Sequence, residues 1–414
     1  MVDLLIKNVK LVDSGRTANV YIKDGHITAI ESLPSEVAAK QTIDAAGALL
    51  SPGFVDSHAH LDKTLSLGEK ESPTLGEACE NFTEYVRSMP RSEFKEDIKT
   101  RARITARKAV LAGTTTIRTH VNIEDDTDLI GVEALNEVRD ELKGLIDIQI
   151  SALPNFIGDL KADKYRYDQL EYVAREGLVD YLGGAPHLHD GTADITEQIF
   201  AIAAKYNISI DLHTDEHDDA NIDNFMHTAE LTKRYGYEGR VSCGHVTALS
   251  AVDDELANKA IQMAYEAKLN VITLPSCNLY LMGRADKHPV RRGITRVREL
   301  DAAGVNVSYA SDNIRDPFRP IGNADMLEEG LITAQVAQMI TRSDLMTIYR
   351  MGTVNPARAL QLDDYGLDVG KRADLVLIDA ADAAEALVNQ ATRLYVIKNG
   401  RVVAQTCKEQ KLID

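Results

Sequence analysis

The sequence predicts an α/β fold: a (β/α)8 barrel of the TIM type, joined to a small β-sandwich domain that both chain ends build. Two observations predict the barrel. Strand-like runs alternate with helical stretches through the middle of the chain, and eight such runs can be counted there. Two similar hairpin signals near the chain ends predict the small domain. An open doubly wound sheet is the structural alternative, but it rarely needs so many consecutive strand–helix units.

The hairpin signals define the small domain. Residues 20–30, VYIKDGHITAI, and residues 395–404, YVIKNGRVVA, place Asp-Gly or Asn-Gly between apolar runs. Such dipeptides favour the type I′ turn of a two-residue β-hairpin. Residues 370–379, GKRADLVLID, offer this domain another strand. We therefore expect a small domain from residues 1–52 and 360–414, with the barrel inserted as residues 53–359.

The barrel strands are expected where short apolar runs are followed by polar residues. Between most of them, apolar residues recur at helical spacing, as in residues 101–113, 195–206 and 254–268. Several of these helices end near Gly or Asn, which is typical of helix C-termini. The eight expected strands are residues 53–60, 114–122, 145–155, 180–188, 208–216, 241–246, 269–277 and 305–313.

Composition excludes several classes of protein. The chain has 414 residues, 44% of them hydrophobic, which is enough for a sizeable core. No apolar run is long enough to cross a membrane, and the N-terminus has the alternation of a strand and not the apolar core of a signal peptide. The net charge of −18 argues against nucleic acid or an anionic membrane as a partner.

The four cysteines form no Cys-x-x-Cys pair, which is typical of a cytoplasmic protein with free thiols. Cys243 and Cys277 fall within expected barrel strands, so we expect them to be small buried residues there. Cys79 and Cys407 lie outside those strands. We therefore expect a cytoplasmic location.

Histidines and carboxylates fall at the ends of the expected strands, where TIM barrels carry their catalytic residues. The His-x-His pair of His58 and His60 ends the first strand, and both side chains point to the same face, so both imidazoles can reach one ion. Imidazole binds zinc and iron, and a carboxylate can complete the ligand shell. An isolated His-x-His pair would more simply be two outward polar positions. Here the other strand ends carry His213, Glu216, His245 and Asp312.

The acidic run DLHTDEHDD, residues 211–219, is costly unless a positive centre or solvent surrounds it. A metal beside His213 and Glu216 would stabilise it. We expect its other titratable residues to form a solvated loop without a catalytic role; these are Asp215, His217, Asp218 and Asp219.

Five further histidines divide into two groups. His120 and His187 end barrel strands. They could support the metal ligands or line the pocket, and plain packing explains them equally well. For the other three, His26, His227 and His288, surface positions are expected.

Several motifs together resemble the amidohydrolase superfamily: PGFVDSHAHLDK, DLHTDE, SCGH, ASDN, and GTVNPARALQL followed by GKRADLVLID. Within it, the segments RTHV, DLHTDEHDD, GRADKHPVRRGITRVREL and SDNIRDPF are most similar to the cytosine deaminase branch. The segments SDNIRD and RLYVIKNGR also resemble the isopropylammelide-type triazine aminohydrolases. That branch replaces the glutamate of the fifth-strand motif, which this chain keeps as Glu216.

The resemblance implies one divalent transition metal, Zn²⁺ or Fe²⁺. Relatives with two metals use a carboxylated lysine on the fourth strand, and residues 180–188 contain no lysine. The implied ligands are His58, His60, His213 and Asp312.

The implied reaction is hydrolytic deamination of a cytosine-like ring with release of ammonia. A metal-bound hydroxide would attack the amidine carbon, and Glu216 would protonate the adjacent ring nitrogen. His245 would orient the hydroxide, and Asp312 would pass a water proton toward the departing ammonia. The His-x-Glu and Pro-Cys-x-x-Cys signature of the cysteine-ligated zinc deaminases is absent.

Three positions of the expected pocket depart from cytosine deaminase. Asn155 stands where that enzyme has glutamine, Asn313 where it has aspartate, and Phe318 where it has tryptophan. We expect these residues to bind the substrate, a small amino-heterocycle that is larger or more substituted than cytosine. The family's habit suggests a homo-oligomer. Two alternatives stay open: a hydrolase of a cyclic amide or an aminotriazine, and a non-catalytic barrel scaffold.

Overall fold

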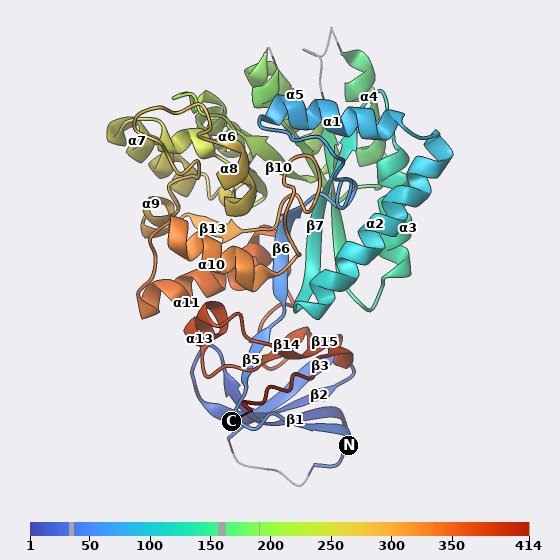
Figure 1. Cartoon of the computed structure of the whole chain (residues 1–414), viewed down its shortest axis with the longest axis vertical. Coiled ribbons are helices and arrows are strands. Elements are labelled where there is room, and N and C mark those ends of the chain that lie inside the picture. The colour runs from blue at the N-terminus through green and yellow to red at the C-terminus, as the bar shows by residue number, and fades with distance from the viewer. Residues whose placement is uncertain (33–36, 156–162, 190, 414) are drawn as a thin grey trace.

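The structure, a computed structural model, describes residues 1–32, 37–155, 163–189 and 191–413. Eight parallel strands form one sheet in chain order, and Figure 1 shows helices packed around it. The sheet closes through a parallel bridge between Ala59 and Asp312, so the (β/α)8 barrel is confirmed over the open sheet. The strands are β6 (Phe54–Ala59), β7 (Thr114–Ile123), β8 (Asp147–Pro154), β9 (Tyr181–Gly184), β10 (Ser209–Thr214), β11 (Val241–His245), β12 (Asn270–Thr273) and β13 (Asn306–Tyr309).

Two of these strands end earlier than expected because a proline follows them. Pro186 begins a short 3-10 helix, η1 (Pro186–Leu188), after β9, and Pro275 begins α8 (Pro275–Leu281) after β12. Proline lacks the N–H that a ladder needs but is tolerated in the first turn of a helix. The placement of Cys277 within a barrel strand is therefore wrong, because Cys277 lies on α8, although it is buried as expected.

The helices begin and end with local signals that the sequence carries. The Asp253 side chain caps α7 by accepting from the backbone of Leu256, and Asn207 ends α5 in a left-handed conformation. The helices are α1 (Leu75–Arg87), α2 (Arg91–Leu111), α3 (Ile130–Glu141), α4 (Lys164–Arg175), α5 (Thr192–Tyr206), α6 (Asp223–Tyr235), α7 (Asp254–Glu266), α8, α9 (Val297–Ala302), α10 (Met326–Val336), α11 (Arg342–Met351), α12 (Val354–Ala359) and α13 (Ala383–Val388), with a second 3-10 helix, η2 (Thr247–Ser250). Within the described ranges, no helix is both long and apolar enough to cross a membrane.

The small domain is a separate mixed sheet made from both chain ends, as Figure 1 shows. It branches at β1, which pairs with β4 along its first half and with β5 at its end. Both hairpins have positive φ at their two central residues, which a type I′ turn requires: Asp24 and Gly25, and Asn399 and Gly400. Its strands are β1 (Val2–Leu11), β2 (Thr17–Lys23), β3 (His26–Glu31), β4 (Ala39–Asp44), β5 (Leu49–Pro52), β14 (Leu375–Ile378), β15 (Arg393–Lys398) and β16 (Arg401–Gln405).

A buried lysine joins the two parts. Lys398 of β15 is fully buried, and its Nζ lies 2.7 Å from carboxylate oxygens of both Asp374 and Asp147. It also donates to the backbone oxygen of Thr115 on β7, at 3.0 Å. Since Asp147 begins β8, this contact fixes the small sheet against the barrel. The first and last strands of the chain lie in the small sheet, while α1 lies at the opposite end of the molecule (Figure 1).

Candidate metal centre and pocket

Four side-chain atoms converge at the carboxyl ends of the barrel strands. The Nε2 atom of His213 lies 3.2 Å from the Nε2 atoms of both His58 and His60. The Oδ1 atom of Asp312 lies 3.2 Å from His60 Nε2 and 3.6 Å from His58 Nε2. A tetrahedral ion with ligand bonds of about 2.0–2.1 Å needs ligand atoms about 3.3–3.4 Å apart. The observed spacing therefore fits one divalent transition metal.

The three imidazoles are in the state that binds a cation. Burial first, and the neighbouring histidines next, hold the pKa of His58 and His213 well below the usual value. The pKa of His60 is also well below its usual value, through burial and then Lys63. Neutral rings present lone pairs, so the centre offers three nitrogens and one carboxylate.

The backbone of the barrel positions these ligands. His58 and His60 alternate with Ala59 on β6 and so share one face, while His213 lies on β10. A side chain at Gly244 of β11 would place its Cβ 2.9 Å from the His58 ring, so glycine there leaves the ring its room. Asp312 has a φ of 57°, in the left-handed region, at the bridge that closes the barrel.

A buried chain of polar groups stands behind His58. His58 Nδ1 lies 3.1 Å from His120 Nε2, which lies 3.0 Å from Asp211 Oδ2. The same carboxylate oxygen lies 2.7 Å from Arg118 Nε, and Arg118 also donates to the Ser57 backbone oxygen. All are buried, so this chain fixes the orientation of the His58 ring. The structure thus places His120 behind a candidate ligand, a position that sequence reasoning left open.

Lys63 is a residue that sequence reasoning missed, although its motif was identified. Its Nζ lies 3.0 Å from His60 Nδ1, and it lies 5.7 Å from the ring centre of Phe82 and 5.6 Å from that of Phe318. The side chain is buried, so its charge acts on the pocket with little solvent screening. The signal was its spacing, three residues after His60, which brings a flexible side chain back to that ring.

Glu216 and His245 lie in direct contact beside the four converging atoms. His245 Nδ1 lies 3.0 Å from Glu216 Oε1, and Asn278 Nδ2 donates to that oxygen at 3.2 Å. Burial lowers the pKa of His245, but the Glu216 carboxylate and its hydrogen bond raise it by more. The net pKa of His245 therefore lies above the usual value. Sequence reasoning missed Asn278 because the expected strand ran over the start of α8.

The acidic run is less solvated than expected. Asp215 is 2% exposed, and its Oδ2 accepts from the backbone N–H of Phe225 at the start of α6. Burial raises its pKa to about 7. The expectation of a solvated loop is therefore wrong for Asp215. Asp218 is half-buried and accepts from the backbone N–H of Gly283, whereas Asp219 is exposed.

The other histidines fall away from the four atoms. His187 lies on η1, beyond the end of its strand, and its Nδ1 contacts the backbone oxygen of His213 at 3.2 Å. His26 and His288 are exposed, as expected, and His227 is half-buried on α6.

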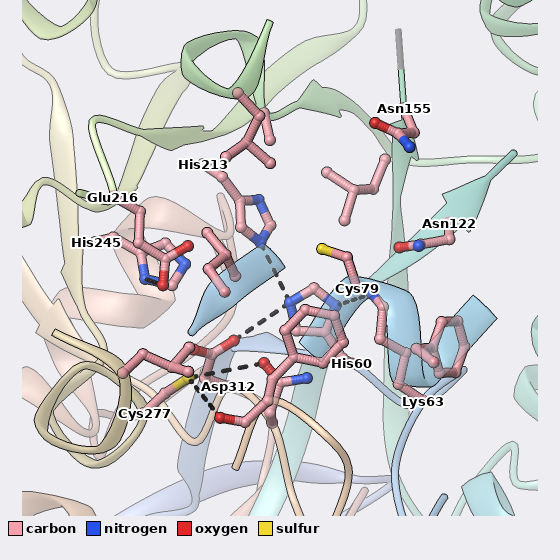
Figure 2. Close-up of a pocket in the computed structure, with 18 of the residues that line it drawn as sticks. His60, Lys63, Cys79, Asn122, Asn155, His213, Glu216, His245, Cys277 and Asp312 are labelled. Atoms are coloured by element: carbon pink, nitrogen blue, oxygen red, sulfur yellow. Dashed lines mark hydrogen bonds and ion pairs between the residues drawn. The ribbon is translucent and has the colours of Figure 1, made fainter. Parts of the chain in front are cut away.

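A pocket with about 760 Å³ of empty space opens beside His60, His213 and Asp312 (Figure 2). It contains all three residues expected to bind the substrate. Asn313 is buried and donates to Asp316 at 2.8 Å, Phe318 is 9% exposed, and Asn155 ends the described part of the β8 segment. The helix α1 covers the pocket. The lining is His60, Lys63, Leu75, Cys79, Phe82, Thr83, Asn122, Glu124, Leu153, Pro154, Asn155, Ala185, Leu188, His213, Glu216, His245, Cys277, Leu281, Asp312, Asn313 and Phe318.

All three groups of potential metal ligands found in the described residues share His58, which is consistent with one centre. The strand β9 contains no lysine that could bridge two ions.

Comparison with known proteins shows which family the chain belongs to. Residues 41–156 and 96–404 match the profile of the Amidohydrolase family. The chain is 32% identical to N-isopropylammelide isopropyl amidohydrolase from Pseudomonas sp. strain ADP, covering 97% of each chain. It is 31% identical to pterin deaminase from Rhizobium rhizogenes, covering 96% of this chain and 90% of the relative.

Solved structures give the same result. The crystal structure of 5-methylcytosine deaminase from Klebsiella pneumoniae with 5-fluorocytosine superposes with a TM-score of 0.92, at 32% identity and 99% coverage of both chains. N-isopropylammelide isopropylaminohydrolase from Burkholderia multivorans superposes with a TM-score of 0.84, at 28% identity and with 98% and 99% coverage. The chain therefore belongs to the amidohydrolase family, with relatives among both the cytosine deaminases and the triazine hydrolases.

Proposed function

We propose that this protein is a metal-dependent hydrolase that deaminates a cytosine-like amino-heterocycle and releases ammonia. The observation that carries the proposal is the convergence of His58, His60, His213 and Asp312 beside the Glu216–His245 pair, at the base of a covered pocket. The relatives support it, because 5-methylcytosine deaminase and pterin deaminase are named for removing amino groups from heterocycles.

His58, His60, His213 and Asp312 would hold one divalent transition metal, Zn²⁺ or Fe²⁺. Such an ion, when bound, lowers the pKa of water to about 7 and so supplies hydroxide at neutral pH.

Glu216 would act on the ring. Its carboxyl group would give a proton to the ring nitrogen beside the carbon that bears the amino group, which makes that carbon a better electrophile. Asn278 and His245 hold this carboxylate at one oxygen, so the other is available to the substrate. General acid–base help of this kind contributes about 10²–10⁴-fold.

His245 and Asp312 would act on the incoming water. His245 would stabilise negative charge on the attacking oxygen, while the Asp312 carboxylate would take a water proton and give it to the departing amine. The C–O bond forms first and gives a tetrahedral carbon. Its hydroxyl proton would return to Glu216 as the C–N bond breaks, and the ring keeps a carbonyl where the amine was. Asn155, Asn313 and Phe318 would hold the ring.

Ammonia release from zinc- or iron-loaded protein tests this function. The panel would contain cytosine, 5-methylcytosine, isoguanine and the aminotriazines, with Glu216→Gln as the inactive control. We expect ammonia from at least one ring, with cytosine not the best substrate. Metal-loaded protein that binds these rings but releases no ammonia from any of them would exclude a deaminase.

A second candidate is hydrolysis of an N-alkylated aminotriazine. The 32% identity to N-isopropylammelide isopropyl amidohydrolase over 97% of the chain favours it. The same assay separates the two functions, because an N-alkyl substrate would release an alkylamine in place of ammonia.

A further inference from the structure

A second group of polar residues lies across the pocket from the Glu216–His245 pair. Figure 2 shows Glu216 and His245 on one side and Asn122, Lys63 and Asn155 on the other. Asn122 is the second-to-last residue of β7, and Glu124 directly follows that strand. Both line the pocket. The mechanism proposed above uses neither of them.

The hydrogen bonds of Asn122 fix which way its amide faces. Its Nδ2 donates to Glu124 Oε1, and a carboxylate can only accept, so the amide nitrogen must face Glu124. The amide oxygen then faces the other way, and Figure 2 shows it toward the pocket. Asn122 is 8% exposed, and its Oδ1 has no hydrogen-bond partner among the described residues. A buried acceptor without a donor costs free energy that a bound ligand can recover.

The carboxylate of Glu124 is also only half satisfied. The backbone N–H of Glu124 donates to Thr127 Oγ1 at 3.0 Å, and this hydrogen bond fixes the turn after β7. Within the described part of the chain, Asn122 is the one hydrogen-bond donor to its carboxylate. Burial raises its pKa, against the lowering effects of Lys63 and Asn122. Glu124 and Cys79 of α1 line the same pocket.

Two acceptors side by side require donors from the substrate. We propose that Asn122 and Glu124 select a ring that carries N–H donors, an amino group or a ring N–H, on the edge away from the metal. A carbonyl oxygen at that edge would face the Glu124 carboxylate and be repelled. The inference deepens the proposed deaminase function and rests on it for the orientation of the ring. It names the substrate class as heterocycles with a further amino group besides the one that is removed.

The test is Glu124→Gln, which keeps the size and the acceptor for Asn122 but turns an N–H₂ toward the substrate. Zinc-loaded protein would be assayed with ammeline, which has two amino groups, and with ammelide, which has one amino group and an oxygen in place of the second. We expect the wild type to prefer ammeline in kcat/KM by about tenfold or more, the effect of one charge-assisted hydrogen bond. The variant should lose most of this preference. Glu133→Gln, on the exposed side of α3, is the matched control and should keep it.

Equilibrium binding separates this inference from the proposed function. Isocytosine carries an amino group where uracil carries an oxygen, and the affinities of both can be measured by calorimetry on metal-loaded Glu216→Gln protein, in which turnover is suppressed. Tighter binding of isocytosine that Glu124→Gln abolishes supports the inference even if no ammonia is ever released. Ammonia release with the same ammeline preference in wild type and variant, at unchanged zinc content and melting temperature, overturns the inference and leaves the deaminase intact.

Discussion

The Asp211→Asn substitution tests the buried chain behind His58 most directly. The change keeps the size of the side chain and removes its charge. Arg118 is fully buried and would keep hydrogen bonds to Ser57 and Ser242 but lose its carboxylate partner. Removing one partner of a buried ion pair costs about 3–5 kcal/mol. Because the remaining hydrogen bonds of Arg118 persist, we expect a loss of about 3 kcal/mol in the free energy of unfolding of zinc-free protein.

Zinc should enlarge that loss. His120 also contacts Asp211 and in turn orients His58. Substitution of a residue that orients a metal ligand typically weakens metal affinity about 10–100-fold. At saturating zinc this removes a further 1.4–2.7 kcal/mol or so, since ligand stabilisation follows the logarithm of the affinity. Urea unfolding of both proteins, with zinc and with a chelator, measures the two terms separately.

An exposed carboxylate provides the matched control. Asp254→Asn removes a carboxylate that pairs with Arg296 at the surface, where its side chain is 86% exposed, and should cost less than about 1 kcal/mol with or without zinc. If Asp211→Asn loses the same free energy in zinc-free and zinc-loaded protein, the carboxylate supports only Arg118 and does not tune the metal centre.

Three other outcomes are expected. Glu216→Gln should keep the metal and the fold while ammonia release falls by about 10²–10⁴-fold; full activity would exclude the acid–base role, and loss of metal would make Glu216 a ligand. Elemental analysis should find one transition metal per chain, and a value near two would contradict a single centre. Asp215 has a folded pKa of about 7, above its unfolded value, so folded protein binds a proton there that unfolded protein releases between about pH 4 and pH 7. Its contribution to stability is therefore lost as pH rises through 7, and Asp215→Asn should remove that part of the pH dependence in chelator-treated protein; equal slopes for both proteins would contradict the assignment.

The barrel and the converging side chains could be predicted because strand ends are marked in the sequence. His58, His213 and Asp312 are far apart along the chain, yet each follows a short apolar run. A parallel barrel brings those positions to one end, so a pattern in one dimension determines a cluster in three.

The parts that the sequence did not predict depend on contacts across the fold. Asn278 reaches Glu216 because Pro275 turns the chain into α8, and apolar residues around Pro275 resemble a strand. Asp215 lies in an acidic run that resembles a surface loop. It is buried because its carboxylate accepts a hydrogen bond from the backbone N–H of Phe225, in the first turn of α6. Asn122 and Glu124 carry no motif of their own, and they become part of a pocket only where α1 and other segments distant in sequence line it with them.

The bridge between Ala59 and Asp312 makes the first and last barrel strands meet at the metal centre. The backbone N–H of His60 donates to the backbone oxygen of Asp312 at 3.3 Å, and the backbone N–H of Asp312 donates to the backbone oxygen of His58 at 2.8 Å. The same two segments supply three of the four converging side chains. An ion held there would therefore link the first and last strands where the barrel closes. After chelation, we expect amide hydrogens along β6 and β13 to exchange faster than those of strands on the opposite side of the barrel.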